Sequence, residues 1–390
     1  MKRFAISGTG SAIADYLYDN VDFTSTAFTR FQSQSPGDGG LEPGKLVLTE
    51  DFEQFAGVEL SSAIREITGG AEPTSFNLGG PAIVALINAA QLLNERNVSI
   101  GFYGANGSDE TGRLLREILE KTPVDCTHLK DHPGSSPSTI VLADPTYAGG
   151  AGERTFVNSQ ASSHRMSPND LDEEFYNADI RLFGGTAVVP PIHTALTQLL
   201  ERSSQKNGLT VVSTVYDFTN EKADPNNHWP LGTDKSYEFI DLLIADEEEA
   251  RRLGGRSSVE SAAEALFSRG LKALVVTCGT EDVHLWTRGE IFGERETKIV
   301  ISRTNTTDRT ATNWDTTGCG DNFCGAVLYS LANQMIEGSP YPFDIVEACR
   351  WGVAAGDFAC YYIGGTYLED APGEKLRFIE KIRERYEANR

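Results

Sequence analysis

The sequence has few cysteines, no long apolar segment and a shortage of basic residues. Its six cysteines are scattered and none lies in a Cys-x-x-Cys pair, which favours reduced thiols over a disulfide framework or a zinc site. No run approaches the ~18 apolar residues that a membrane span requires. The basic start at Lys2 and Arg3 also lacks the apolar region of a signal peptide. We therefore predict a cytoplasmic protein that has no membrane partner.

The charge balance excludes a second class of partner. Lysine and arginine total 34 of the 390 residues, and aspartate and glutamate total 56, so the formal net charge is −22. An acidic chain repels a phosphate backbone, so we do not expect nucleic acid as a partner. A small anion held in one local pocket is still compatible with this charge. The histidines show no spacing that is typical of metal ligands.

What the sequence does contain is an alternation of short β-branched runs with longer segments of helical spacing. This order predicts βαβ units, and hence a mainly parallel sheet covered by helices on both faces. The expected strands are Phe4–Ser7, Val98–Tyr103, Ile180–Phe183, Leu209–Val215, Leu242–Ala245 and Ala273–Thr277. The expected helices are Pro81–Asn94, Asp109–Lys121, Pro191–Ser203, Val259–Arg269, Asp321–Met335 and Glu374–Asn389.

The last of these expected helices is amphipathic. Leu376, Ile379, Ile382 and Tyr386 fall on one stripe, and the opposite face carries mixed charge. This pattern predicts a terminal helix that docks on the protein through its apolar stripe.

Two stretches interrupt the alternation. Residues 16–75 hold no clear βαβ unit and include a loop at 35–40. Residues 138–160 are typical of a hairpin, with two short strands around a turn at 145–152. We interpret the two stretches as one small β lid beside a large α/β body. The predicted body then comprises residues 1–15, 76–137 and 161–390, and the predicted lid comprises residues 16–75 and 138–160.

The strongest local signal is the string Asp315-Thr316-Thr317-Gly318-Cys319-Gly320-Asp321, which an apolar run follows. Glycines let the backbone turn tightly and approach a ligand closely. The run behind them is an expected helix, whose first N–H groups and positive dipole end would form an anion site. An isolated Gly-x-Gly-Asp would favour a helix cap for Asp321. The full string favours a carboxylate that accepts a proton from a group attacking the bound anion, as phosphoryl transfer to an alcohol requires.

The same string resembles the C-terminal motif of the PfkB family of carbohydrate kinases, also called the ribokinase-like family. Further matches follow in the family's order over nearly the whole chain. Gly8–Asp15 is similar to the family's first strand and its substrate aspartate, and Gly79–Ala82 to its Gly-Gly pair. Gly104–Gly112 is similar to a glycine-rich turn, Asp241–Ala250 to the segment with the Asn-x-x-Glu motif, and Val275–Gly279 to a nucleotide-side strand end.

The resemblance implies a three-layer α/β/α body with a mainly parallel sheet and a β-sheet lid. It also implies ATP as donor, Mg²⁺, a sugar-like alcohol as acceptor and, near Asp315 and Thr317, a monovalent cation such as K⁺. A homodimer through the lid is an arrangement that it allows. The residues that match by position are, with the roles implied for them, Asp321 as the base; Gly318, Cys319 and Gly320 as the anion hole; Asp15, Gly79 and Gly80 at the acceptor; Thr277 and Gly279 at the nucleotide; and Asp246 and Glu249 at Mg²⁺ through water.

Three positions depart from the family pattern. The first residue of Asn-x-x-Glu is Asp246, so a carboxylate replaces an amide. Val84 stands where the family often has an asparagine, and Cys319 stands where it usually has an alanine. These departures keep open a binding protein on a kinase fold that does not turn over. Nucleoside and vitamin-alcohol kinases are also open, as is a nicotinamide dehydrogenase on the partial glycine pattern at 8–13.

Two further expectations concern the site itself. The predicted lid has few basic residues, Arg30, Lys45, Arg65 and Arg154, so we expect an uncharged acceptor rather than a sugar phosphate. Cys319 lies between two glycines at a helix start, so we expect a reactive thiol whose alkylation inactivates the enzyme and against which MgATP protects. Cys324, one turn further along, is the competing thiol.

Overall fold

A computed structural model describes residues 3–388, apart from 36, 95, 151, 280 and 300–315. Within these residues, nine strands form a large sheet. In spatial order they are β14 (Arg295–Ile299), β13 (Val283–Thr287), β12 (Ala273–Thr277), β11 (Leu242–Asp246), β10 (Leu209–Ser213), β9 (Ile180–Gly184), β1 (Phe4–Thr9), β5 (Val98–Gly107) and β6 (Leu129–His132). The pairs from β6 to β12 are parallel, and β12, β13 and β14 pair antiparallel. The predicted mainly parallel sheet is therefore confirmed; the two antiparallel edge strands were not predicted.

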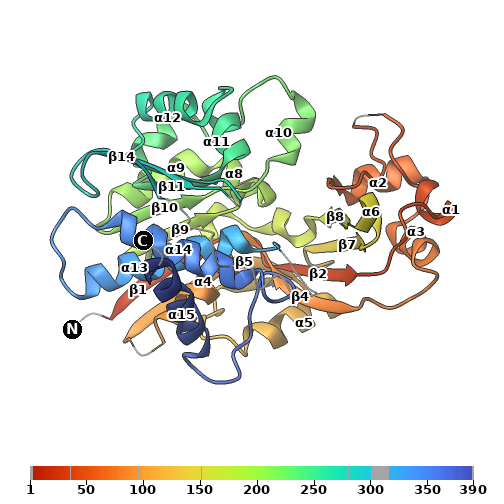
Figure 1. Ribbon diagram of the computed structural model, residues 1–390, viewed down its shortest axis with the longest axis horizontal. Helices are drawn as coiled ribbons and strands as arrows, with labels where there is room; N and C mark the ends of the chain where they lie inside the picture. The colour runs from red at the N-terminus through yellow and green to blue at the C-terminus, as the bar shows by residue number, and fades with distance from the viewer. Residues whose placement is uncertain are drawn as a thin grey trace.

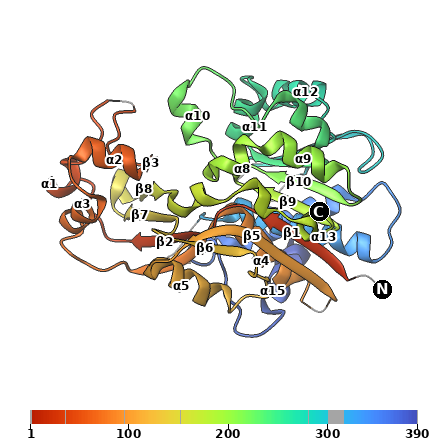
Figure 2. The same ribbon diagram turned by 180° about the vertical axis from the view of Figure 1, so that it is seen from behind.

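Helices cover both faces of this sheet, because successive residues of central strands such as β10, β11 and β12 are buried and point to opposite sides. Leu242 and Ile244 of β11 pack into one core, and Leu243 and Ala245 pack into the other. The first core lies under α4 (Pro81–Leu92), α13 (Cys319–Ile336), α14 (Ile345–Ala359) and α15 (Glu374–Ala388), which lie in front of the sheet in Figure 1. The second lies under α8 (Pro190–Thr194), α9 (Leu196–Ser204), α11 (Glu247–Gly254) and α12 (Val259–Ser268), seen from the other side in Figure 2. No helix in the described ranges has the length and apolar character needed to cross a membrane.

One residue of the terminal helix α15 is placed differently from its sequence pattern. Lys375 does not lie on a charged outer face: it is only 1% exposed. Its position precedes Ile379 by four residues and Ile382 by seven, so it lies on the same helical stripe as these apolar residues. The predicted docking of α15 is confirmed by its packing on α14 and α4.

The small sheet lies at one end of the body (Figure 1). Its order is β3 (Leu46–Leu48), β8 (Glu153–Ser159), β7 (Ser138–Asp144), β2 (Ile13–Tyr18) and β4 (Ser75–Gly79). The predicted hairpin at 138–160 is β7 with β8, which pair antiparallel. The division of the chain at the boundaries given above stays a prediction.

The two faces of the small sheet differ in chemistry. The register aligns Asp15 with Thr139 and Thr139 with Asn158, so these three side chains share the face that we call the inner face. A hydrogen bond of 3.0 Å from Asn158 Nδ2 to Thr139 Oγ1 joins two of them. The outer face is apolar: Leu142 and Val157 pack with residues of α1 (Thr26–Thr29), α2 (Thr49–Ala56) and α3 (Leu60–Ile67). Residues 16–75 therefore supply the small sheet with a hydrophobic core of its own.

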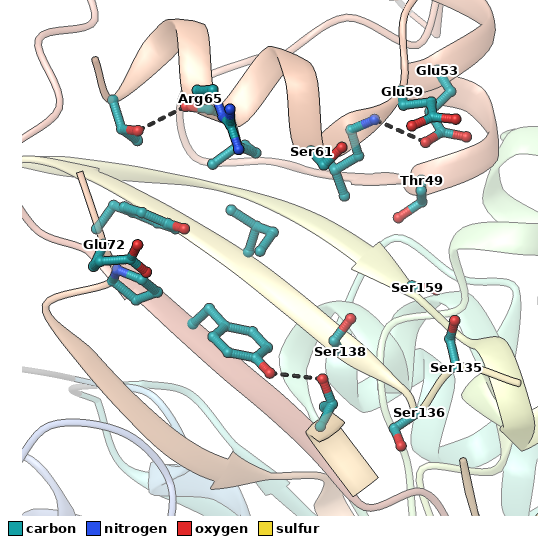
Figure 3. Close-up of a pocket in the computed structure, with 18 of the residues that line it drawn as sticks. Thr49, Glu53, Glu59, Ser61, Arg65, Glu72, Ser135, Ser136, Ser138 and Ser159 are labelled. Atoms are coloured by element: carbon teal, nitrogen blue, oxygen red, sulfur yellow. Dashed lines mark hydrogen bonds between the residues drawn. The ribbon is translucent and has the colours of Figure 1, made fainter. Parts of the chain in front are cut away.

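A groove of about 850 Å³ lies between α3 and the outer face of the small sheet (Figure 3). Glu59, Ser61 and Arg65 line it from the side of α3, and Ser138 lines it from the sheet. Asp15 is on the inner face and does not line this groove. The groove is thus separate from the face that carries the predicted acceptor residues. A homodimer through the small sheet stays a prediction, and α1–α3 of the same chain cover much of the outer face through which it would form.

Candidate active site

The predicted anion hole lies at the start of α13, an 18-residue helix. Gly318 is the N-cap with a φ of 75°, a left-handed conformation that glycine adopts without strain. A Cβ on Gly318 would lie 2.5 Å from Gly365 Cα, so the loop also presses against the segment before α15. A Cβ on Gly320 would meet no atom of the described residues within 4 Å. The Gly320 side of this turn is therefore uncovered by the described residues, with the positive end of α13 behind it.

Asp321 is in the first turn of α13 and is partly buried. Burial disfavours the charged carboxylate and raises the pKa of Asp321 to about 6. A carboxyl with a pKa near 6 is ionised at neutral pH and still basic enough to accept a proton. The geometry thus provides a carboxylate beside a turn of backbone N–H groups.

Asp246 and Glu249 lie where β11 ends and α11 begins, and they form a capping box. Asp246 Oδ1 accepts from the Glu249 N–H at 2.7 Å, and Glu249 Oε2 accepts from the Asp246 N–H at 3.0 Å. Glu249 Oε2 also accepts from Thr214 Oγ1 at 2.6 Å. An aspartate replaces asparagine in this motif without loss of the cap, because both side chains carry an accepting oxygen.

The carboxylates of Asp246, Glu249 and Asp321 are close enough to affect the pKa of Glu249. Burial first, and then the charge of Asp246, raise the pKa of Glu249 to about 8; the charge of Asp321 acts in the same direction. Burial also raises the pKa of Asp246. Acidic groups from β11–α11 and from α13 therefore face a common region. Glu249 is buried, and Asp246 lies at the solvent-exposed end of β11. Neighbouring carboxylates with raised pKa values are a fitting environment for a divalent cation, which would stabilise their ionised forms.

The acceptor residues predicted near the N-terminus lie together. A Cβ on Gly79 would lie 2.2 Å from Asp15 Oδ2, and a Cβ on Gly80 would lie 2.1 Å from the Ser11 carbonyl oxygen. Gly80 has a φ of 111° and begins α4 through Pro81. The two glycines are thus required by close backbone approach, and they keep Asp15 against the start of α4.

The two nucleotide-side residues are at the neighbouring strand end. The register pairs Thr277 with Asp246, so Thr277 lies beside the capping box at the carboxyl edge of the large sheet. Gly279 has a φ of 55°, and a Cβ there would meet nothing within 4 Å in the part of the chain that the structure describes. In the large sheet β1 has β5 on one side and β9 on the other, so the strand order reverses at β1. Open α/β sheets bind ligands at such a point.

Backbone and side-chain contacts connect the acceptor side to the α13 loop. The Arg154 guanidinium, on the inner face of β8, donates to Thr317 Oγ1 at 3.0 Å. Asn77 of β4 accepts at Oδ1 from the Thr366 N–H at 3.0 Å, and Thr366 Oγ1 donates to the Leu78 carbonyl oxygen at 2.6 Å. The segment 363–366 therefore lies between β4 and Gly318.

Sequence reasoning missed most of these connecting residues. Thr139 lies in a strand that the sequence predicts, and Asn158 directly follows the predicted strand 154–157. Their common face with Asp15 depends on the parallel pairing of β2 with β7, which joins distant segments. The Gly364-Gly365 pair was a usable signal for close packing, since Gly365 lies against Val84 and Gly318. Val84 is 1% exposed in α4, so it belongs to the core.

Asp109 and the cysteines near the loop have contacts that account for them structurally. Asp109 caps α5 (Glu110–Leu119) by accepting from the Gly112 N–H at 2.9 Å. Cys324 is fully buried, which raises its pKa to about 12 and makes it a poor competing thiol. Cys319 Sγ lies 3.4 Å from Cys360 Sγ, so Cys360 is the nearer thiol. The reactivity of Cys319 stays a prediction, and Asp315 lies outside the described residues.

Comparisons with known proteins agree with this arrangement. The sequence model described as pfkB family carbohydrate kinase matches residues 59–371. A fructokinase from Vibrio alginolyticus is 24% identical over 303 residues, which cover 77% of this chain and 91% of the relative. The solved adenosine kinase from Sinorhizobium meliloti has a TM-score of 0.69 at 16% identity, covering 96% of this chain and 99% of that one. For the ribokinase from Thermotoga maritima the TM-score is 0.63 at 18% identity, with coverage of 97% and 99%.

The fold is thus ribokinase-like, with the three-layer body and the small sheet that the resemblance implied. The family match spans well over half of the chain, so the protein belongs to the pfkB family of carbohydrate kinases. Membership makes it a kinase that transfers a phosphoryl group to a sugar or a nucleoside; such kinases use ATP, generally with Mg²⁺. The dehydrogenase alternative is set aside, since strand β2 follows Gly8–Ser11 where a dinucleotide site needs a helix.

Proposed function

We propose that the protein transfers the γ-phosphoryl group of MgATP to a hydroxyl of an uncharged sugar or sugar-like alcohol in the cytoplasm. The observation that carries this proposal is the Gly318–Gly320 turn at the start of α13, with the Asp321 carboxylate in the first helical turn. An alcohol needs a base to become a nucleophile, and the transferred group needs donors for its equatorial oxygens. The two requirements are met within four consecutive residues.

In the proposed reaction, Asp321 accepts the proton of the acceptor hydroxyl. The hydroxyl oxygen forms a bond to the γ-phosphorus, and the bond from that phosphorus to the β–γ bridging oxygen breaks. ADP leaves with the electron pair of the broken bond. Backbone N–H groups of residues 318–320 stabilise the charge on the transferred group. Asp15 and the backbone at Gly79-Gly80 orient the acceptor, and the small sheet, acting as a lid, excludes water that would compete as nucleophile.

Asp246 and Glu249 would hold Mg²⁺ through water, and Thr277 and Gly279 would contact the nucleotide beside them. When bound, the cation offsets the charge of the donor phosphates. The charge of Asp246, at the exposed strand end, disfavours ionisation of the buried Glu249, and a cation would relieve this repulsion. A monovalent cation near Thr317 stays a prediction.

The inner face favours a neutral acceptor. Arg30 and Lys45 form ion pairs with Glu66 and Glu42 at 2.6 Å each, and Arg65 lines the groove on the opposite face. Arg154 already binds Thr317 of the loop. A second phosphate on the acceptor would need several cations to offset it, whereas Asp15, Thr139 and Asn158 suit hydroxyl groups.

The test is coupled ADP release over a panel of hexoses, pentoses, sugar acids, sugar phosphates and nucleosides. We expect the highest kcat/KM with a neutral sugar, and a kcat about 10²–10⁴-fold lower with Asp321→Asn at the same substrate concentrations. A higher kcat/KM for fructose 6-phosphate than for every neutral sugar would overturn the proposed acceptor class. Nucleotide binding without turnover of any acceptor would support the non-catalytic alternative instead.

A nucleoside is the second candidate, and a row of apolar side chains favours it. Leu17, Val141 and Phe156 are aligned on the inner face, two residues beyond Asp15, Thr139 and Asn158. Phe156 is partly exposed and presents a ring on which a base could stack. Phe156→Ala distinguishes the candidates: a nucleoside kinase loses about tenfold or more in kcat/KM, whereas a sugar kinase keeps its kcat/KM within about twofold.

A further inference from the structure

A buried lysine behind the anion hole has no role in the function proposed so far. Lys375 lies in α15, beyond residue 371, where the family match ends. It is 1% exposed, and its ammonium donates to Asn322 Oδ1 at 2.8 Å. Asn322 is the residue after Asp321 and is 0% exposed. A lysine in such a place is costly unless its charge is used, because burial of an ammonium loses its hydration.

The amide of Asn322 is the link between Lys375 and the loop. Its Nδ2 donates to the carbonyl oxygens of Gly318 and Gly365, at 2.9 Å each. An asparagine amide could face either way, but an ammonium has donors and no acceptor. The lysine therefore forces the amide oxygen toward itself, and the amide N–H groups must face the two glycine carbonyls.

The surrounding groups hold this link in place. The Asn88 amide of α4 donates to the Asn322 carbonyl oxygen at 2.6 Å. The Tyr362 ring lies 5.9 Å from the Lys375 ammonium, and the Tyr362 hydroxyl donates to the Gly365 carbonyl oxygen at 3.3 Å. The Glu369 carboxylate accepts from the Lys375 N–H at 2.8 Å, which fixes the start of α15. Burial lowers the pKa of Lys375 to about 7, and Glu369 opposes this shift.

We propose that Lys375 is a positioning residue for phosphoryl transfer: by orienting the Asn322 amide, it holds Gly318 and the anion-hole turn in the conformation that binds the transferred group. It touches neither substrate. A displacement of about 1 Å in such a turn lowers turnover by about 10²-fold. This inference rests on the proposed function of the turn, and it predicts a loss in kcat with little change in acceptor KM, since the inner face of the small sheet keeps its own contacts.

The first experiment compares Lys375→Met with Lys381→Met, which removes a lysine from the exposed part of the same helix. We expect Lys375→Met to lose about 10²-fold in kcat at an acceptor KM within about twofold of the parent, and Lys381→Met to change neither. Lys375→Arg, which keeps a charged donor, should recover at least part of kcat. A Lys375→Met variant with parental kcat would overturn the inference even if Asp321→Asn is inactive, so the proposed base and the positioning role are tested separately.

A second measurement does not depend on turnover. Hydrogen exchange of the backbone amides at 318–322 should be at least about tenfold faster in Lys375→Met than in the parent or in Lys381→Met. Unchanged exchange in this segment would overturn the inference, whether or not an acceptor has been found.

A double-mutant cycle of Lys375 and Asn322 in kcat distinguishes a positioning role from a general effect on stability. If Lys375 acts through Asn322, adding Lys375→Met to Asn322→Ala causes no further loss in kcat. Losses that multiply would contradict the inference. If Lys375→Met does not fold, Lys375→Gln replaces it in the same cycle and is judged by the same criterion. All assays are run well below the lowest Tm of the set.

Discussion

The two halves of the candidate site are held in different ways. The α13 loop lies on buried polar contacts, in which Asn322 alone joins Gly318, Gly365, Asn88 and Lys375. The small sheet instead has a core of its own under α1–α3. The β4 edge of this sheet contacts the segment before α15 through Thr366, and Arg154 contacts Thr317, but the helices α1–α3 are tied to the body by an exposed ion pair at 2.5 Å, from Lys222 of α10 (Phe218–Ala223) to Asp51 of α2. Buried networks specify one geometry, whereas an exposed pair is weak and easily exchanged. We therefore expect a fixed half, which carries the proposed chemistry, and a half that moves to admit the acceptor as far as its contacts at Arg154 and Thr366 allow.

The largest expected effect is at Asp321, the proposed general base in the fixed half. Asp321→Asn should lower kcat by about 10²–10⁴-fold, the range for loss of a general base, while ATP affinity changes little. The folded-state pKa of Asp321 is raised to about 6, so ionisation of this carboxyl above its unfolded pKa costs stability. The neutral variant should therefore have a higher Tm than the parent at pH 8. Near-parental turnover by this variant would show that another group is the base.

The next effect comes from a matched pair of glycines in the loop. Gly318→Ala places a Cβ 2.5 Å from Gly365 Cα at a φ of 75°, whereas the Cβ of Gly320→Ala meets no described atom within 4 Å. We expect Gly318→Ala to lose about 1–3 kcal/mol of unfolding free energy and about 10²-fold in kcat. Gly320→Ala should keep the parental Tm, so any loss in its kcat reports on the anion site alone. Denaturant unfolding and steady-state kinetics measure both. Equal loss of stability in the two variants would mean that the loop is not anchored at Gly318.

The pH dependence sharpens the assignment of the base. Asp321 must be ionised to accept a proton, and its pKa is about 6. The kcat/KM should therefore fall about tenfold for each pH unit below this value, whereas a fall above pH 7 would report loss of the Lys375 proton, since the pKa of Lys375 is about 7. The measurement is a profile from pH 5 to pH 8 with saturating MgATP. A profile without an acid limb in this range would exclude Asp321 as the titrating base.

The smallest effect is expected in the movable half. Asp51→Asn removes the ion pair with Lys222, which is worth about 0–1 kcal/mol as an exposed pair. The acceptor KM should rise less than about threefold with kcat unchanged, and added salt should reduce the difference between variant and parent. Glu50→Gln, one residue away and exposed, is the control for charge alone. A large loss in kcat would mean that the small sheet takes part in the chemistry and is not only an adjustable cover.

The sequence predicts the parts of the fold that repeat a period. Buried strands such as Leu242–Asp246 and the helix at 81–92 follow from apolar runs and spacing, and the Gly318–Asp321 turn follows from glycine conformation. The inner face could not be predicted, because Asp15, Thr139 and Asn158 meet only through pairings between distant strands. Lys375 was missed for another reason: a lysine among apolar residues looks like an interruption of a stripe, and only a buried acceptor explains it.

The position of α15 also has a consequence for the order in which the enzyme is completed. A chain that grows from its N-terminus makes both sheets, the inner face and α13 before it makes residues 374–388, and domains begin to fold during synthesis. An intermediate folded as far as Thr366 would hold Asp15, Asp246 and Asp321, yet the amide of Asn322 would lack the ammonium that orients it. Such an intermediate could bind nucleotide before it can transfer phosphate. The kinase would then become active only when α15 docks, although α15 lies behind the α13 loop and contacts no substrate.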